Sequence, residues 1–237
     1  FWVNPTPPTL ANPFVTTLRV NATVPAVTFG QLTHTLSSNT VWDARVGRFV
    51  LDLKNDPSSG DRTAANHSDQ VTGISSGNAP EIGGLLIKRL TAKAVLNHYR
   101  SGWIGGDHQM RIGTSVERGE HSSPVVIPGG VRYVDNAGQP FRAISRTPAI
   151  SGGRFNTAAL FASDSLTMND RVTVNAGVRY DHSDAISQDL HALDTAGLET
   201  DTVITGLGKL YTWNVISPRL GVTAKLITGS GKSSFGS

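Results

Sequence analysis

The chain has 237 residues, of which 38% are hydrophobic, a formal net charge of +3 and no cysteine. The mild charge comes without a dense run of Lys or Arg, which disfavours a nucleic-acid partner, and the lack of cysteine excludes disulfides and thiolate metal sites. No stretch approaches the roughly 18 apolar residues of a membrane helix, but this does not exclude a barrel, whose strands alternate polar and apolar residues.

The hydrophobic pattern predicts an antiparallel, all-β chain. Residues 1–26, rich in Pro, Asn and Thr, are predicted to be irregular, with one short extended piece at 15–20. Strands are predicted at 27–36, 41–53, 85–99, 108–118, 155–167, 171–181 and 211–226. Short turns are predicted near 38, 104, 169 and 229, and long polar loops at 54–84, 119–154 and 183–210. A small hairpin is predicted inside the second loop, with 131–133 and 141–143 on either side of a turn.

The clearest alternation lies in residues 171–181. Apolar residues occupy the even positions of this stretch from Val172 to Tyr180, and polar or small residues occupy the odd positions from Arg171 to Asp181. A period of two over ten residues predicts a strand with one apolar and one polar face. Other predicted strands alternate in the same way, although Arg48 interrupts the apolar face of 41–53.

The connections alternate between short and long along the whole chain. This is the layout of outer-membrane barrels, which have short turns at one end and long loops at the other. Aromatic residues near the strand ends are interpreted as two interfacial girdles. Those by the short turns are Trp42, Tyr99 and Trp103, and those by the long loops are Phe155, Tyr180, Tyr211 and Trp213.

Three stretches together resemble the barrel of TonB-dependent outer-membrane receptors, particularly the Oar-like branch. The first is F-A-S-D-S-L-T-M-N-D-R-V-T-V-N-A-G-V-R-Y-D at 161–181, the second T-V-W-D-A-R-V-G at 40–47, and the third S-P-R-L-G-V-T at 217–223. The resemblance covers most of residues 27–237. Because no signal peptide, TonB-box-like segment or plug domain is recognised in this sequence, we expect an internal piece of the barrel domain, carrying about seven or eight strands.

The resemblance implies a 22-stranded barrel in the outer membrane of a Gram-negative bacterium, with an N-terminal plug. It implies import of a bulky nutrient of the siderophore, oligosaccharide or peptide class, driven through a TonB-type energy-transducing protein. The partners implied are the lipid bilayer, the plug, that transducer and an extracellular ligand that the sequence does not identify. Two alternatives remain: a passive porin or adhesin barrel, and a soluble all-β binding module.

Charged side chains on the polar strand faces are the candidate functional residues. A charge facing lipid costs several kcal/mol near the membrane midplane, so these residues are predicted to face a wet lumen, where most would pair with one another. The lumen-facing candidates are Arg45, Arg89, Lys93, Arg111, Asn175, Arg179, Asp181 and Arg219, alongside Asp43 and Glu117.

Motifs for catalysis, nucleotides and metals lack the context that they need. The G-x-S-x-G pattern at 73–77 lies in a polar loop without the strand and helix of a nucleophile elbow. Residues 229–233 resemble the end of a phosphate-binding loop, but Leu226 occupies the position where that motif requires its first glycine. The seven histidines form no H-x-x-x-H pair, and the spacing of the aspartates between 181 and 201 fits no calcium loop. The sequence therefore predicts no enzyme activity, no cofactor and no metal.

Overall fold

The computed structural model describes residues 2–3, 7–22, 26–169 and 171–225. The long strands are β3 (Ala26–Ser37), β4 (Thr40–Pro57), β7 (Ile82–Trp103), β8 (Gly106–Val126), β11 (Ala149–Met168), β12 (Val172–Ser187) and β15 (Gly208–Ala224). The short strands are β1 (Trp2–Val3), β2 (Leu18–Ala22), β5 (Asn66–Asp69), β6 (Ser75–Ser76), β9 (Val131–Asn136), β10 (Gln139–Ser145), β13 (Leu190–Leu193) and β14 (Glu199–Ile204). Two 3₁₀ turns are present, η1 (Phe14–Thr16) and η2 (Pro128–Gly130).

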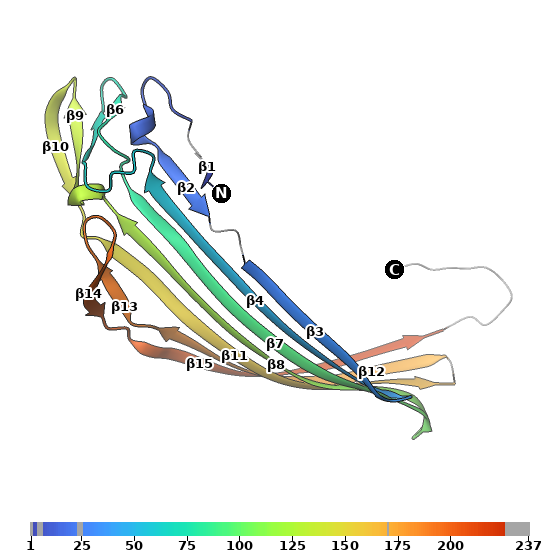
Figure 1. Ribbon diagram of the computed structural model, residues 1–237. Helices are drawn as coiled ribbons and strands as arrows, with labels where there is room; N and C mark the ends of the chain where they lie inside the picture. The colour runs from blue at the N-terminus through green and yellow to red at the C-terminus, as the bar shows by residue number, and fades with distance from the viewer. Residues whose placement is uncertain (1, 4–6, 23–25, 170, 226–237) are drawn as a thin grey trace, which may run out of the picture.

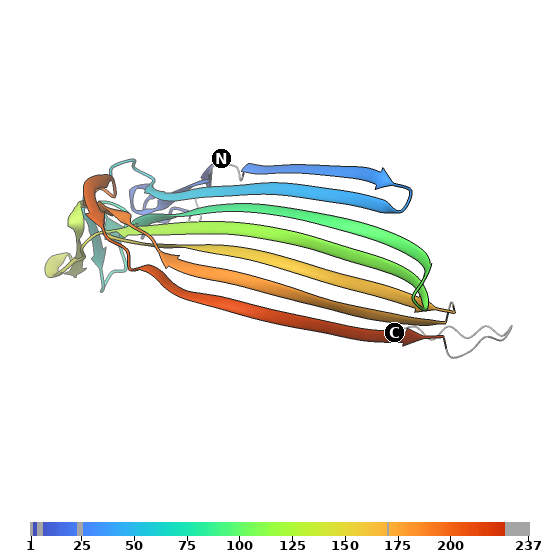
Figure 2. The same ribbon diagram turned by 90° about the horizontal axis from the view of Figure 1, so that it is seen from below.

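The long strands form one curved antiparallel sheet in the order β3-β4-β7-β8-β11-β12-β15. Figure 2 shows them side by side, with β3 at one edge and β15 at the other. Among the described residues these two edge strands do not pair with each other, so the sheet is an open section of a barrel. No helix in the described ranges is long and apolar enough to cross a bilayer.

Two separate segments share the edge of β4. The half of β4 nearer its start, up to Val50, pairs with β3, and the half from Leu53 to Pro57 pairs with β2. Residues 1–26, predicted to be irregular, therefore contribute a strand to the main sheet. The extended piece predicted at 15–20 overlaps this strand, but a strand of five residues is too short to show a period of two clearly.

The two kinds of connection lie at opposite ends of the sheet (Figure 1). The short ones are residues 38–39, 104–105 and 169–171, and the long ones are 58–81, 127–148 and 188–207. The strands extend farther than the alternation predicts: β7 begins at Ile82 and β11 at Ala149, both inside segments predicted to be loops. The turn predicted near 229 lies outside the described residues.

The long connections fold into a layer of their own. In it, β10, β9, β5 and β6 form a four-stranded sheet, and β13 and β14 form a two-stranded one. The predicted hairpin is β9 and β10, and β5 pairs in parallel with β9, which joins the first long connection to the second. A small buried cluster lies beneath, formed by Ala79, Ile82, Val126 and Ile127, each at most 3% exposed.

Asn78 holds the first long connection in place. Its side chain is fully buried, and its amide nitrogen donates to the carbonyls of Asp61 and Ala64, both at 2.9 Å. The Asn66 amide donates in turn to the Asn78 carbonyl at 2.6 Å. These bonds satisfy backbone groups that have no ladder partner, which is how an irregular segment can pack closely.

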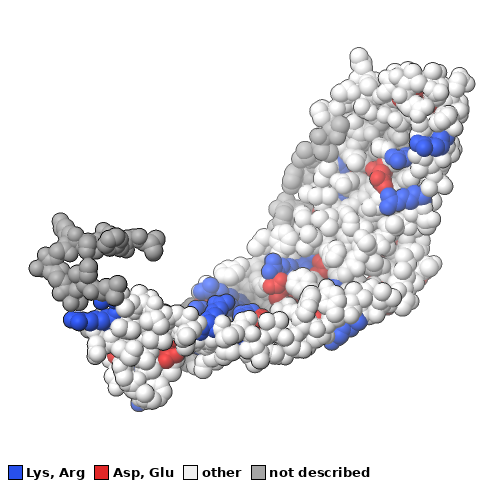
Figure 3. All heavy atoms as spheres, turned by 180° about the vertical axis from the view of Figure 1, so that it is seen from behind, with Lys and Arg blue, Asp and Glu red and all other residues white. Residues whose placement is uncertain are grey.

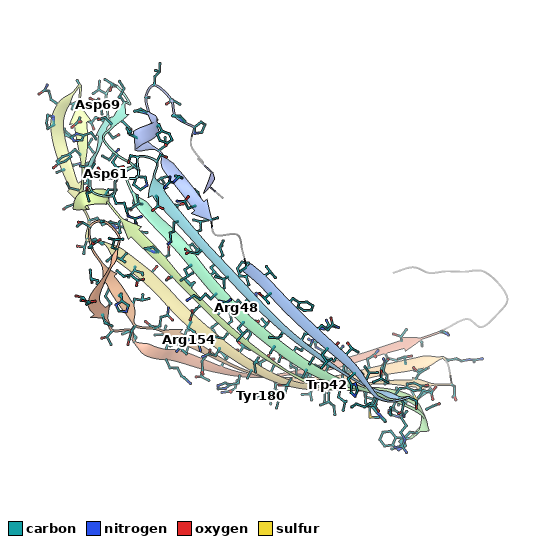
Figure 4. All side chains as sticks on the ribbon, viewed as in Figure 1. Trp42, Arg48, Asp61, Asp69, Arg154 and Tyr180 are labelled. Atoms are coloured by element: carbon teal, nitrogen blue, oxygen red, sulfur yellow. The ribbon has the colours of Figure 1, made fainter. Side chains whose placement is uncertain are left out.

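Asp69 closes the turn after β5 (Figure 4). One carboxylate oxygen accepts from the amides of Val71 and Thr72 at 2.8 and 2.9 Å, and the other accepts from the Gly138 amide at 2.5 Å. Led by the bonds from Thr72 and Gly138, these donors lower the pKa of Asp69 to about 2. The ionised carboxylate therefore links the turn after β5 to the β9–β10 hairpin.

This linkage predicts a pH dependence. Because the folded pKa is lowered, the contribution of Asp69 to loop stability is fully present above its ordinary pKa of about 3.9 and is lost as the pH falls through about 2. At pH 7, Asp69→Asn should accelerate proteolysis within 69–81 and 131–145 in the parent protein, because a neutral amide accepts these bonds more weakly. Asp201→Asn, at an exposed position on β14, is the matched control. Equal proteolysis of the two variants would contradict the linkage.

Candidate functional site

Strand register divides the main sheet into two faces. Residues paired across antiparallel strands project from the same side, and neighbours along a strand project from opposite sides. Arg179 pairs with Phe161 and Ser217, whereas Val178 pairs with Ala162 and Pro218. We call the two sides the Arg179 face and the Val178 face.

All eight predicted lumen-facing residues share the Arg179 face. The register connects Arg45, Lys93 and Asp181 through one row of partners. A neighbouring row contains Arg111 and Arg219. The others lie in rows of the same parity, which sets Arg89, Asn175 and Arg179 on that side as well. The alternation of the sequence therefore brings them together on one surface.

The Val178 face is apolar over three consecutive rows. The first row contains Trp42, Leu96, Ile112 and Val178, and the next two contain Leu32, Val46, Val116, Leu160 and Ile216. No Lys, Arg, Asp or Glu occurs in these three rows among the described residues. Trp42 is half-buried, but the other large side chains named here are uncovered, from 37% exposed at Leu96 to 69% at Ile216. No described part of the chain covers them.

Part of the charge on the Arg179 face is neutralised by close ion pairs. Arg179 contacts Asp181 through both Nε and Nη2, at 2.8 to 3.0 Å. Arg45 pairs with Asp43 and Arg89 with Glu117, each at 2.8 Å. Such pairs satisfy the charges on a surface that also offers hydroxyl and amide partners, and Asp43 accepts from Thr33 as well.

Three cations on this face have no carboxylate partner among the described residues. They are Lys93, Arg111 and Arg219. Two of them flank the ring of Phe161: Lys93 Nζ lies 5.5 Å from its centroid, and the guanidinium of Arg111 lies 6.0 Å away. A cation at such a distance is attracted to the negative face of the ring, but its charge is not cancelled.

Gly113 provides the space in which Phe161 lies. The two residues are cross-strand partners, and a Cβ on Gly113 would overlap the ring while lying 2.7 Å from the Ala94 carbonyl oxygen. A ring over a strand glycine covers backbone that would otherwise be bare. Phe155 lies over Gly119 in the same way.

A hollow of about 530 Å³ opens on the Arg179 face beside these cations. Its polar lining comes from two arginines, one carboxylate and several amide and hydroxyl side chains: Asn97, Gln109, Arg111, Ser163, Asp164, Ser165, Asn175 and Arg219. A second hollow of about 190 Å³ adjoins it and is lined by Lys93, Arg111, Phe161, Arg179 and Arg219. Guanidinium, amide and hydroxyl donors therefore converge on open space. Chemically, this arrangement suits a polar or anionic group rather than an apolar one.

The register divides the seven aromatic residues that were interpreted as two interfacial girdles between the two faces of the sheet. Four of the seven lie on the Arg179 face, opposite the apolar rows: Tyr99, Phe155, Tyr211 and Trp213. Their positions in the sequence indicate how far along a strand they lie. Whether a residue number is odd or even in its strand decides the face, and these four lie on the polar face. Tyr180 lies in the middle of β12 rather than beside a long connection, in the row next to that of Trp42 (Figure 4).

Trp42, Trp103 and Tyr180 remain candidates for membrane-interface residues. Trp42 and Tyr180 have the parity of Val178, and Trp103 packs edge-on against His108, whose row contains Leu166 and Val174. His108 in turn contacts Asp164 at 2.6 Å. An aromatic side chain at a membrane interface needs both an apolar and a polar environment. The end of the Val178 face nearest the short turns, where Trp103 lies, offers both.

A third hollow, at the long-connection end, was not foreseen from the sequence. It measures about 480 Å³ and is lined by residues that include Asn12, Ser68, Arg132, Tyr133 and Arg142. Nearby, His67 stacks on Tyr133 with ring centroids 4.8 Å apart and contacts Asp135 at 3.0 Å. Because β5 and β9 are more than 60 residues apart in the chain, no local pattern could have revealed their pairing.

The aspartates between 181 and 201 do not form one site. Asp181 pairs with Arg179, Asp184 with Lys209, and Asp194 accepts from backbone amides of its own turn. In the part of the chain that the structure describes, no group of three or more His, Asp or Glu side chains could hold a metal ion. Residues 73–77 comprise the end of the turn after β5, the two-residue strand β6 and Gly77, and the segment that follows leads into β7 rather than a helix. Residues 229–233 lie outside the described ranges.

Comparison with known proteins gives a family over nearly the whole chain. Residues 4–229 match the family model described as TonB dependent receptor-like, beta-barrel. Among solved structures, the chain is similar to the ferric-catecholate import receptor Fiu from E. coli K12 in its open form, with 20% sequence identity and a TM-score of 0.45. The match covers 86% of this chain and 32% of the Fiu chain, so the chain spans about a third of that receptor. No curated protein matches.

The packing of Phe161 predicts a steric cost at Gly113. In the parent protein, Gly113→Ala should lower the folding yield and destabilise the barrel by about 1 to 3 kcal/mol, because the new methyl group overlaps the ring and crowds the Ala94 carbonyl. Gly221→Ala, on β15 with open space around the new atom, is the control and should fold like the unmodified protein. The measurement is denaturant unfolding followed by tryptophan fluorescence, and equal midpoints would refute the packing role.

Proposed function

The chain belongs to the TonB-dependent receptor-like β-barrel family, and from this premise we propose that it forms part of the wall of an outer-membrane transporter that imports a bulky nutrient. The nutrient is of the siderophore, oligosaccharide or peptide class. The rest of the barrel, the plug and the contact with a TonB-type energy-transducing protein come from other parts of the parent protein.

The Val178 face is proposed to contact lipid and the Arg179 face the lumen. Support comes from the three uncharged rows, whose large side chains are exposed in the isolated sheet. Three rows occupy six residues, or about 20 Å along a strand at about 3.4 Å per residue. Because the strands of such barrels are tilted by about 35–45°, this corresponds to about 15 Å of height, more than half of the apolar band of about 25 Å. The opposite face has too many charged side chains to meet hydrocarbon.

The short turns are proposed to face the periplasm and the long connections the outside. Support comes from their separation to opposite ends of the sheet (Figure 1) and from the layout of this class of barrel. In this orientation, the layer that contains β5, β6, β9 and β10 stands where an incoming solute first arrives. The hollow lined by Arg132 and Arg142 is then an entry surface.

The observation that carries the proposal is the group of cations without carboxylate partners on the Arg179 face. Lys93, Arg111 and Arg219 border a hollow of about 530 Å³ and its smaller neighbour. Their charge is available to carboxylate, phosphate or phenolate groups of a passing nutrient, or to the plug. No covalent step is required, since binding and displacement are enough for transport.

Two other functions remain as competitors. A passive porin or adhesin barrel would have the same two faces but no energy coupling. In water, a soluble binding module would need another surface to cover its apolar face. That face is exposed in this structure. The fold alone does not distinguish active from passive transport, so an uptake experiment is needed to do so.

The orientation of the two faces predicts opposite results for two arginine substitutions on β12. Val178→Arg should impair assembly of the parent protein in the outer membrane, at a cost of about 2 to 4 kcal/mol near the midplane. Asn175→Arg should assemble normally, because it points into a hydrated hollow. Heat-modifiable gel mobility measures the folded fraction of each variant. A worse result for Asn175→Arg would reverse the assignment of the faces.

Transport predicts a dependence on energy and on the free cations. Cells expressing the parent protein should accumulate one of a panel of ferric siderophores, oligosaccharides and peptides, and a protonophore should abolish the uptake. The double variant Arg111→Gln, Arg219→Gln should lower uptake by about tenfold or more if each guanidinium contributes a charge-assisted hydrogen bond. Arg45→Gln, whose charge Asp43 already balances, should lower it less. Uptake that the protonophore leaves unchanged would favour a passive porin.

A further inference from the structure

The Val178 face changes character abruptly toward the long connections. The two rows that follow the three uncharged ones contain seven charged side chains, five basic and two acidic. The basic residues, which we call the outer belt, are Arg48, Lys88, Arg118, Arg154 and Lys209. The acidic residues are Glu120 and Asp184. Figure 3, a view from behind, shows that charged side chains gather in separate clusters over this molecule, with uncharged surface between them.

The belt crosses the sheet from β4 to β15. One row pairs Arg48 with Leu90, and Leu90 with Arg118. The other row pairs Lys88 with Glu120, and Glu120 with Arg154. Figure 4 shows Arg48 and Arg154 on different strands of the sheet, both farther from the short turns than Trp42. In the alternation of residues 41–53, Arg48 interrupts an apolar face, whereas in the register it is one member of a row of charged residues.

The acidic residues neutralise only part of this charge. Glu120 contacts both Lys88, at 3.2 Å, and Arg118, at 3.8 Å, so one carboxylate serves two cations. Lys209 contacts Asp184 at 2.9 Å. Among the described residues, Arg48 and Arg154 form no ion pair, and Nε of Arg154 is buried without a hydrogen-bond partner.

A shallow groove of about 270 Å³ lies within the belt. Its lining includes Arg48, Lys88, Leu90, Arg118 and Glu120. Arg118 and Lys88 have side chains 54% and 47% exposed, and Arg48 is exposed as well. Three exposed cations beside one carboxylate leave an excess of positive charge around the apolar residue Leu90. An anion with an attached apolar part fits this combination.

We propose that the outer belt binds the phosphate groups of lipid headgroups, with the lipid chains lying along the uncharged rows. The inference rests on the membrane orientation of the proposed function. Guanidinium groups bind phosphate in a bidentate manner, and basic residues placed just beyond a hydrophobic surface recognise anionic lipids. Continuity with the apolar rows selects a lipid over a free anion or an acidic protein, because neither of these would use the adjoining hydrocarbon-facing surface.

The test measures binding of bisphosphorylated lipid A, carried in neutral detergent micelles, to the intact parent protein. The double variant Arg48→Gln, Arg118→Gln should weaken binding at least about fivefold, because two cations near an anionic headgroup are removed. The matched control is Arg45→Gln, Arg179→Gln, which removes two arginines from the opposite face of the sheet, neither of which lines the groove. It should change binding less than twofold, and 0.5 M salt should weaken binding of the unmodified protein.

Each other outcome counts against the proposal in a distinct way. Equal binding by the belt variant and the unmodified protein, with normal heat-modifiable assembly, overturns the lipid site but leaves the transporter intact. A loss of binding in the opposite-face variant alone reverses the two faces and overturns the proposed function with it. Full competition by 10 mM inorganic phosphate, or equal binding of dephosphorylated lipid A, would show that the surface does not recognise a phosphorylated lipid.

Discussion

The backbone hydrogen-bond ladder is the constraint on which the rest of this structure depends. In a strand, successive side chains alternate between faces, so one register decides the surroundings of every residue in the sheet. The pairing of β11 with β12 continues without a shift from Arg154 to Met168. A slip of β12 by one residue would carry Arg179 and Asp181 to the side of Leu160 and Ala162, and Val178 to the opposite side. The free-energy cost of exchanging the two sets of side chains determines the register, because the backbone hydrogen bonds would be equally satisfied in either register.

Much of the sheet could be foreseen because its information is local. The alternation from Val172 to Tyr180 predicted both the strand and its faces, and the same parity held for Lys93, Arg111 and Arg219 on other strands. The ends of the strands could not be foreseen. Beyond the apolar rows the outer surface of the sheet is polar, as at Lys88 and Glu120, so strand and loop have the same composition there.

The candidate site was less accessible to sequence reasoning than the scaffold. Parity identified which charges share a face, but not which of them are neutralised. Arg45 and Arg179 have carboxylates two residues away along the same strand, whereas Arg111 and Arg219 do not. The role of Phe161 required the knowledge that Gly113 is its partner on β8. The aromatic residues show the same limit: the position of Phe155 near a strand end is visible in the sequence, but the register is needed to place it on the Arg179 face.

The parallel pairing of β5 with β9 has a consequence for engineering. Two connections that the chain visits about 65 residues apart share one small sheet, and the Asp69 carboxylate binds the Gly138 amide of the other connection. The long connections are therefore not a set of interchangeable modules. Grafting one of these connections onto another barrel would leave the edge of a β-strand and an ionised carboxylate without their partners. Moving both connections together transfers a complete folding unit. Recombination among related barrels should therefore keep the two segments from the same parent.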